Sequence, residues 1–171
     1  PVRASVLQYG RQWIEADDVA AVAEALQSDL VTTGPRVVEF ERALAARVAA
    51  RHAVAVSSGT AALHAAAFAA GIKPGGEVIV APLPFAATTN CVLYLGGTPL
   101  FADIRPDTLT VDPADVERKI TSRTRAIILV DFAGHPCDLD PLLEFARARN
   151  LVVIEDAAHA LGAEYRGHPV G

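Results

Sequence analysis

Short runs of β-branched and other apolar residues alternate with longer Ala-rich or amphipathic stretches along this chain. Each short run is bounded by turn residues, which is typical of strands buried on both faces of a sheet. Because strands that alternate with helices imply crossover connections, the sequence predicts an α/β fold with a mainly parallel sheet and helices on both faces. We expect strands at residues 52–56, 78–80, 99–102, 126–130 and 151–154, and helices at about 15–27, 37–48, 61–70, 86–95, 113–120 and 138–149.

The overall composition excludes several classes of protein. Hydrophobic residues make up 51% of the chain and charged residues 20%, which is enough to build a core and too apolar for general disorder. A net charge of −5 provides no basic face for nucleic acid, and no apolar run reaches the roughly 18 residues that span a bilayer. Because the first residues lack the profile of a signal peptide, we expect a cytoplasmic protein in which Cys91 and Cys137 are reduced thiols and not metal ligands.

In open α/β sheets, ligands gather at the carboxyl ends of the strands, and three such ends carry informative residues. The first is VAVSSGTAAL at 54–63, where a helix begins directly after the expected strand. Free backbone N–H groups, the positive end of the helix dipole and the Thr60 hydroxyl would surround one point there, which suits a phosphate. Alternatively, Ser58 or Thr60 only caps the helix. The segment contains neither GxGxxG nor a P-loop, which disfavours a dinucleotide or a nucleoside triphosphate.

The second strand end is LVVIEDAAH at 151–159, in which two carboxylates follow four apolar residues. By the alternation of a strand, Glu155 and Asp156 should point to opposite sides, so one can face a ligand while the other serves packing or a cap. A buried carboxylate requires a cation or hydrogen-bond donors, and a protonated aromatic nitrogen would be such a partner. The alternative is an Asp that caps a helix beside a surface Glu, with His159 packed or solvated.

The third strand end is APLPFAATTN at 81–90, where two prolines lead out of the strand and Phe85 opens the next helix. A planar side chain at this edge could lie against a ring that the other two loops bind, although plain core packing is the simpler interpretation for Phe85 alone. Together the three strand ends predict a ligand with a phosphate at one end and a flat, protonatable heteroaromatic ring at the other. Pyridoxal 5′-phosphate has that shape.

The chain resembles the DegT/StrS family of sugar aminotransferases. The motifs that carry the resemblance occur in the family's order and spacing: VTTGP at 31–35, VEFE at 38–41, SSGTAAL at 57–63, PFAATTN at 84–90, GGTPLFADI at 96–104, FAGHPCDLD at 132–140 and VVIEDAAHALGAEYRG at 152–167. The resemblance implies the aspartate-aminotransferase type of fold (fold type I), pyridoxal phosphate as cofactor, and a homodimer with active sites that contain residues of both subunits. It further implies transfer of an amino group, commonly from glutamate, onto a keto carbon of a nucleotide-linked sugar.

The resemblance also assigns expected roles to individual residues. Gly59 and Thr60 match the family's phosphate-binding turn, and Phe85 matches the aromatic residue that stacks on the cofactor ring. Asp156 matches the carboxylate that pairs with the pyridine nitrogen, where an anion keeps the ring protonated as an electron sink. His159 lies where the family has His or Gln near the phenolic oxygen of the ring.

Thr32, Thr33 and Gly34 match the family's TTGP segment at the mouth of the site, where contact with substrate is expected. The family's Schiff-base lysine follows the EDAAH motif by some tens of residues, so we expect it beyond Gly171. The chain contains two lysines. Lys73 is expected in a turn at the opposite end of the sheet and Lys119 on a polar helix face, so neither should be that catalytic group.

We therefore expect an N-terminal helical segment at 1–30, followed at 31–171 by the N-terminal part of the cofactor-binding large domain. The rest of that domain and the small C-terminal domain are expected outside the sequence, in which case the chain alone would be inactive. Two alternatives stay open. The protein could be a sugar dehydratase of the same family, with histidine at the lysine position, or a non-catalytic regulatory or interaction domain.

Overall fold

The computed structural model describes residues 12–171, and it divides the chain into two units at residues 1–40 and 41–171. In the first unit, helix α1 (Ala16–Gln27) begins with a capping box in which the backbone N–H of Glu15 donates to the Asp18 carboxylate, 2.8 Å away. The helix predicted at 15–27 is thus confirmed. Helix α2 (Pro35–Arg47) begins with a proline, which is favoured in the first turn, and crosses the boundary between the units.

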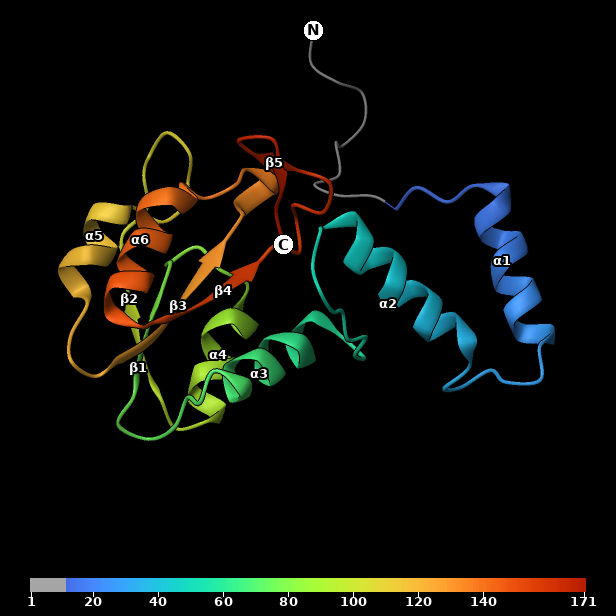
Figure 1. Ribbon diagram of the computed structural model, residues 1–171, viewed down its shortest axis with the longest axis horizontal. Coiled ribbons are helices and arrows are strands. Elements are labelled where there is room, and N and C mark those ends of the chain that lie inside the picture. The colour runs from blue at the N-terminus through green and yellow to red at the C-terminus, as the bar shows by residue number, and fades with distance from the viewer. Residues whose placement is uncertain (1–11) are drawn as a thin grey trace, which may run out of the picture. The chain divides into compact units, whose positions relative to one another are not determined.

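The second unit is built on a four-stranded parallel sheet (Figure 1). Its strands are β1 (Glu77–Val80), β2 (Thr98–Phe101), β3 (Thr124–Val130) and β4 (Val152–Asp156), in the spatial order β2-β1-β3-β4. All four residues of β1 and nearly all of β3 are buried, as expected for strands covered on both faces. Four of the five predicted strands and the parallel sheet are therefore confirmed.

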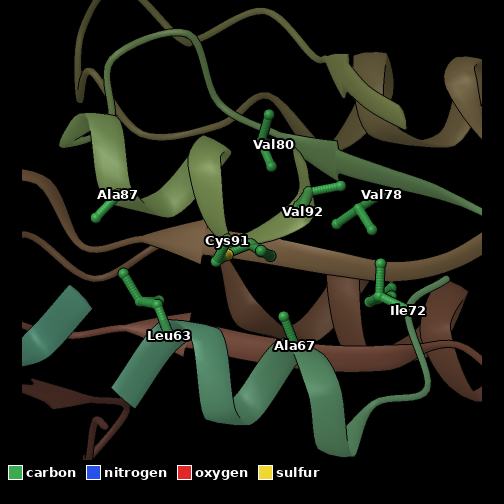
Figure 2. Close-up of a cluster of buried hydrophobic side chains, with 10 residues drawn as sticks. Leu63, Ala67, Ile72, Val78, Val80, Ala87, Cys91 and Val92 are labelled. Atoms are coloured by element: carbon green, nitrogen blue, oxygen red, sulfur yellow. The ribbon is translucent and has the colours of Figure 1, made fainter. Parts of the chain in front are cut away.

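Helices cover both faces of this sheet (Figure 1). On one face, α3 (Gly59–Ala69) and α4 (Ala86–Tyr94) form a core with Val78, Val80 and Ile128 of the two central strands. Figure 2 shows part of this core, with Leu63 of α3 on the same side of the cluster as Ala87 of α4. On the other face, α5 (Pro113–Lys119) and α6 (Leu139–Arg149) pack against the opposite side chains of the same strands.

The strand predicted at 52–56 was wrong. These residues form no strand, and Val54 is 79% exposed. The described sheet offers them no hydrogen-bonding neighbour, because its order ends at β4. Instead, the backbone N–H of Ala55 donates to the Glu41 carboxylate of α2 at 2.8 Å. A β-branched run becomes a strand only when another strand pairs with it, which composition alone does not reveal.

After β4 the chain forms a two-stranded hairpin, β5 (Glu164–Tyr165) and β6 (His168–Pro169). Arg166 and Gly167 at its tip have φ values of 51° and 79°, as a tight two-residue hairpin turn requires. The Tyr165 hydroxyl donates to Asp138 at 2.7 Å, which ties the hairpin to the start of α6. A short 3-10 turn, η1 (Phe132–Gly134), follows β3. Within residues 12–171, no helix is long and apolar enough to cross a membrane.

Candidate functional site

The carboxyl ends of the parallel strands lie at one edge of the sheet, where α3 and α4 also begin. Val80 at the end of β1 is paired with Ile128, and Val130 at the end of β3 is paired with Asp156. The N-terminal halves of α3 and α4 belong to one hydrophobic cluster through Leu63 and Ala87 (Figure 2). This arrangement brings the three predicted strand ends to one region of the second unit.

The start of α3 leaves donors available for an anion. Ser58 is the N-cap, and its hydroxyl accepts from the Ala61 N–H at 3.2 Å, so the capping interpretation holds for this serine. Gly59 and Thr60 form the first turn, where N–H groups have no partner within the helix. A Cβ atom built at Gly59 would meet nothing within 4 Å, so the surface at this residue is open. Free N–H groups at the N-terminus of an 11-residue helix can bind a phosphate.

Phe85 stands at the N-cap of α4 with φ −65° and ψ 142°, and its carbonyl accepts from the Thr88 N–H at 2.9 Å. Its side chain is 73% exposed. Core packing, the simpler of the two sequence interpretations, therefore does not account for Phe85. An exposed aromatic ring fixed at the start of a helix offers a flat surface on which another ring can stack.

Asp156, the last residue of β4, is held by donors from two directions. Its Oδ2 accepts from the Thr88 hydroxyl at 2.7 Å, and its Oδ1 accepts from the Ala158 N–H at 3.4 Å. Thr88 is fully buried and lies one turn into the helix that Phe85 opens. Within the described part of the chain, no ion pair includes Asp156. The carboxylate is thus oriented but has no cation, which is the arrangement that a protonated ring nitrogen would complete.

Thr88 is a site residue that the sequence reasoning did not single out. A threonine in the first turn of an apolar helix is ordinarily read as part of the core, and only its pairing with Asp156, 68 residues away, gives it a role. The available signal was its position three residues after Phe85, which places it within one helical turn of that residue.

Glu155 and Asp156 point to opposite sides, as the alternation of a strand predicted. Ile154 packs in the core of α3 and α4, which is the side of Asp156, whereas Val153 packs in the core of α5 and α6, which is the side of Glu155. Glu155 is half-buried, so the alternative of a solvated surface glutamate does not apply. Burial raises its pKa to about 7.

His159 is exposed and lies in the turn after β4. Its Nδ1 accepts from the Ala133 N–H at 3.4 Å, and its ring meets the edge of Phe132 with 6.3 Å between centroids. The turn after β3 therefore orients this imidazole at the same edge of the sheet. This contact holds the ring in place without burying it.

Thr32, Thr33 and Gly34 belong to the first unit, immediately before α2. The Thr33 hydroxyl donates to the Thr32 carbonyl at 2.7 Å, and Thr33 has a φ of 52°. A side chain on Gly34 would come within 2.6 Å of the Leu30 carbonyl oxygen, so only glycine fits there. The segment is a tight turn built by close backbone approach.

The two lysines have other surroundings. Lys73 lies in the turn that precedes β1, at the amino end of the strands. Lys119 pairs with Asp115 at 2.9 Å and also donates to the Phe101 carbonyl. Both placements agree with the expected ones. The two cysteines are buried thiols, and burial raises the pKa of Cys91 and that of Cys137, the latter to about 12.

A cavity of about 290 Å³ lies apart from these residues, beside the hairpin and the loop that precedes α6. Its two arginines are already paired, Arg105 with Asp107 at 2.9 Å and Arg166 with Asp140 at 2.5 Å. None of the predicted cofactor residues lines it. The candidate site is instead the open edge formed by the strand ends.

Two curated relatives are similar to nearly all of this chain. The spore coat polysaccharide biosynthesis protein SpsC of Bacillus subtilis (strain 168) is 44% identical over 169 residues, which are 99% of this chain and 43% of SpsC. The UDP-4-amino-4-deoxy-L-arabinose–oxoglutarate aminotransferase of Shewanella sediminis is 44% identical over 94% of this chain and 42% of its own length. The chain thus spans less than half the length of these relatives.

Solved structures show the same fold. S. venezuelae DesV in complex with a ketimine intermediate superposes with a TM-score of 0.88 at 43% identity, over 91% of this chain and 42% of DesV. NtdA of Bacillus subtilis with bound cofactor PMP gives 0.83 at 36% identity, over 90% and 36% of the two chains. The expected aspartate-aminotransferase type of fold is therefore confirmed. Residues 12–171 match the family model as well, so the chain belongs to the DegT/DnrJ/EryC1/StrS aminotransferase family.

Proposed function

We propose that this chain forms the cofactor-binding part of a pyridoxal-phosphate-dependent enzyme that transfers an amino group from an amino acid such as glutamate to a nucleotide-linked keto-sugar. The observation that carries the proposal is the Thr88–Asp156 hydrogen bond, which fixes a carboxylate without an ion-pair partner among the described residues against the helix that Phe85 opens. The name of the S. sediminis relative, with its UDP-linked sugar and oxoglutarate, supports this substrate class. The PMP held by NtdA supports the cofactor, because PMP is the aminated form of pyridoxal phosphate.

The residues present fit that cofactor. The free N–H groups of Gly59 and Thr60, with open space in front of Gly59, suit its phosphate. The exposed Phe85 ring suits the face of its pyridine, and Asp156, which has donors but no cation, suits the ring nitrogen. His159, exposed at the same edge, suits the phenolic oxygen.

Each of these groups has a separate task. When bound, the cofactor supplies a protonated pyridine ring that withdraws electrons from the substrate carbon. Asp156 holds the proton on the ring nitrogen, and Thr88 fixes the carboxylate that does so. Phe85 fixes the plane of the ring, and the first turn of α3 binds the phosphate. We further propose that Thr32, Thr33 and Gly34 contact the sugar substrate.

Replacement of the ring partner tests this assignment. In the complete gene product, Asp156→Asn keeps the shape and the Thr88 contact but removes the charge, so transamination should fall about 100-fold or more. Asp140→Asn, which changes an exposed aspartate on α6, is the matched control. Rates of glutamate-dependent amino transfer to a UDP-linked keto-sugar would be compared, and equal rates for both variants would contradict the role of Asp156.

The amine that binds the cofactor covalently is proposed to be neither Lys73 nor Lys119. Borohydride reduction of the complete gene product with added pyridoxal phosphate, followed by peptide mapping, should label a lysine elsewhere in the protein. Stoichiometric label on Lys73 or Lys119 would overturn the assignment. No label at any lysine, together with dehydration of the sugar, would indicate the dehydratase instead.

A cytoplasmic homodimer is proposed as the working form. Val19, Val22 and Leu26 follow one another at helical spacing on a single face of α1, and no residue of α1 is buried. Such an apolar stripe needs a covering surface, and the family resemblance supports a second copy. Sedimentation of the complete gene product should give twice the mass of one chain, with Leu26→Glu lowering that value.

A further inference from the structure

Two acidic side chains that the proposed reaction does not use meet beside Asp156. Asp131 directly follows β3 and is completely buried, and Glu155 is the penultimate residue of the neighbouring β4. The backbone N–H of Asp131 donates to the Asp156 carbonyl at 3.2 Å, which extends the ladder of β3 and β4 by one bond. The two carboxyl groups therefore belong to the same strand ends that carry the proposed ring partner.

Each carboxyl group has one oxygen with a donor and one without. Asp131 Oδ1 accepts from the Cys137 N–H at 2.9 Å, and Glu155 Oε2 accepts from the Gly171 N–H at 2.9 Å. The remaining oxygens are Asp131 Oδ2 and Glu155 Oε1. Both are buried, and neither accepts a hydrogen bond from a donor among the described residues. Among residues 12–171, neither carboxylate takes part in an ion pair.

Two charged carboxylates whose remaining oxygens are buried, without a cation, would repel each other and leave two acceptors unsatisfied. One proton between them removes both penalties, because it neutralises one charge and donates to the other group. We infer that Glu155 Oε1–H donates to Asp131 Oδ2, and that this shared proton positions Asp156 and His159. The positioning part rests on the proposed function, whereas the shared proton does not.

The electrostatics of the neighbourhood agree with this placement of the proton. Burial raises the pKa of Glu155 to about 7, the Gly171 N–H opposes the rise, and the Asp131 carboxyl adds to it. Burial raises the pKa of the Cys137 thiol, and the neighbouring Asp131 carboxyl adds to that rise. The other titratable groups nearby are Asp156 on β4 and His159, whose ring contacts the turn after β3.

The pair links four pieces of backbone at the edge of the site. Asp131 joins the end of β3 to the loop at Cys137, and Glu155 joins the end of β4 to Gly171. Between these anchors, the Asp131 N–H holds the Asp156 carbonyl and the Ala133 N–H holds the His159 ring. Loss of the shared proton should therefore loosen both proposed ring contacts at once.

The shared proton predicts how stability depends on pH. Folded protein keeps the Glu155 proton up to about pH 7, whereas an unfolded glutamate releases it near its ordinary pKa of 4.5. The folded state thus binds more protons between these values, and stability must fall as pH rises through this window. For the complete gene product, the folding equilibrium constant should fall by up to about 300-fold from this group alone.

Glu155→Gln is the decisive variant, because its amide N–H can still donate to Asp131 Oδ2 but cannot be ionised. Its unfolding free energy from urea titrations should lose the fall between pH 4.5 and 7, while Glu144→Gln, at an exposed position on α6, should keep it. An unchanged pH dependence in Glu155→Gln would overturn the shared proton. Asp131→Asn gives an independent check, since its amide stabilises ionised Glu155 and should also flatten the curve.

The proposal that the shared proton positions Asp156 and His159 is tested by the absorbance of added pyridoxal phosphate. Glu155→Ala removes the donor and should shift the pH midpoint of the visible band of the bound cofactor, and Glu155→Gln should restore it. A band in Glu155→Ala identical to that of the natural protein would overturn the positioning role. If neither the variants nor the natural protein bind the cofactor, the proposed function is wrong. The urea experiment still tests whether Glu155 and Asp131 share a proton.

Discussion

Thr88 shows how much a single hydroxyl can contribute at this sheet edge. It is fully buried, its hydroxyl donates to Asp156, and its carbonyl accepts from the Cys91 thiol. A buried hydroxyl is stabilising only when it is paired, and here its partner is the carboxylate proposed to face the cofactor ring. Its contribution is therefore divided between the stability of the fold and the orientation of the site.

Replacement of Thr88 separates these two contributions. Thr88→Val keeps the shape and removes the donor, so Asp156 loses its shortest hydrogen bond, and affinity for pyridoxal phosphate should fall by about 10-fold. Thr88→Ser should restore most of it, and Thr89→Val is the neighbouring control. The measurement is a titration of the complete gene product followed by absorbance. Unchanged affinity in Thr88→Val would show that the hydroxyl does not orient the site.

At the residue scale, the sequence predicted groups that belong to recognisable motifs near strand ends, and it missed those whose roles depend on tertiary pairing, although Asp131 also follows a strand. Phe85, Asp156 and His159 lie within five residues of the end of an apolar run, so their position near the sheet edge could be predicted from the pattern alone. Thr88 and Asp131 looked like ordinary residues of a helix and a loop. Their roles come from partners 68 residues away for Thr88 and 24 for Asp131, which local patterns do not encode.

Among the elements, the short helix α5 is stabilised mainly by the contacts of one acidic residue. Asp115 is buried, and its carboxylate accepts from the Asp103 N–H and pairs with Arg118 at 2.6 Å and Lys119 at 2.9 Å. These donors hold its pKa at about 2. A seven-residue helix is marginal by itself, so this carboxylate attaches α5 to the segment that leaves β2.

Asp115 should make the fold sensitive to acid. Because its folded pKa is depressed below the ordinary value, its stabilisation is fully present above about pH 4 and is lost as pH falls toward 2. Asp115→Asn should lower the unfolding free energy at pH 7 and remove this part of the acid dependence. Asp29→Asn, at an exposed aspartate, serves as the control in thermal melts from pH 7 to 2. Parallel acid profiles for natural protein and Asp115→Asn would contradict this.

The helices and strands also differ in how well the sequence predicted them. Helices were predicted within one or two residues because caps and apolar periodicity are local signals, as Asp112 shows by capping α5 with a 3.0 Å bond to Ala114. The strand at 52–56 was wrong because pairing is not local. Its β-branched residues predicted a strand, but only the sheet order could reveal that no neighbour is present among residues 12–171.

At the scale of the whole molecule, the second unit is organised around two almost completely buried strands. β1 and β3 lie in the middle of the sheet, with a helical layer over each face, whereas β2 and β4 lie at its edges. Apolar burial of this kind provides most of the stability of a small α/β domain. Asp156, Asp131 and Glu155 all lie at the carboxyl ends of this sheet, where the enclosed strands stop.

Because β1 is completely buried, exchange of its amide protons reports on global unfolding. The amide protons of Val78, Ile79 and Val80 reach water only when the entire unit opens, so their deuterium uptake should be the slowest in the chain and should track global unfolding. Amides at the start of α3 should exchange orders of magnitude sooner. Mass spectrometry of exchanged peptides would measure both, and rapid uptake in β1 would contradict the prediction. Slow and fast amides in one sample thus distinguish a variant that destabilises the whole second unit from one that disturbs only the candidate site.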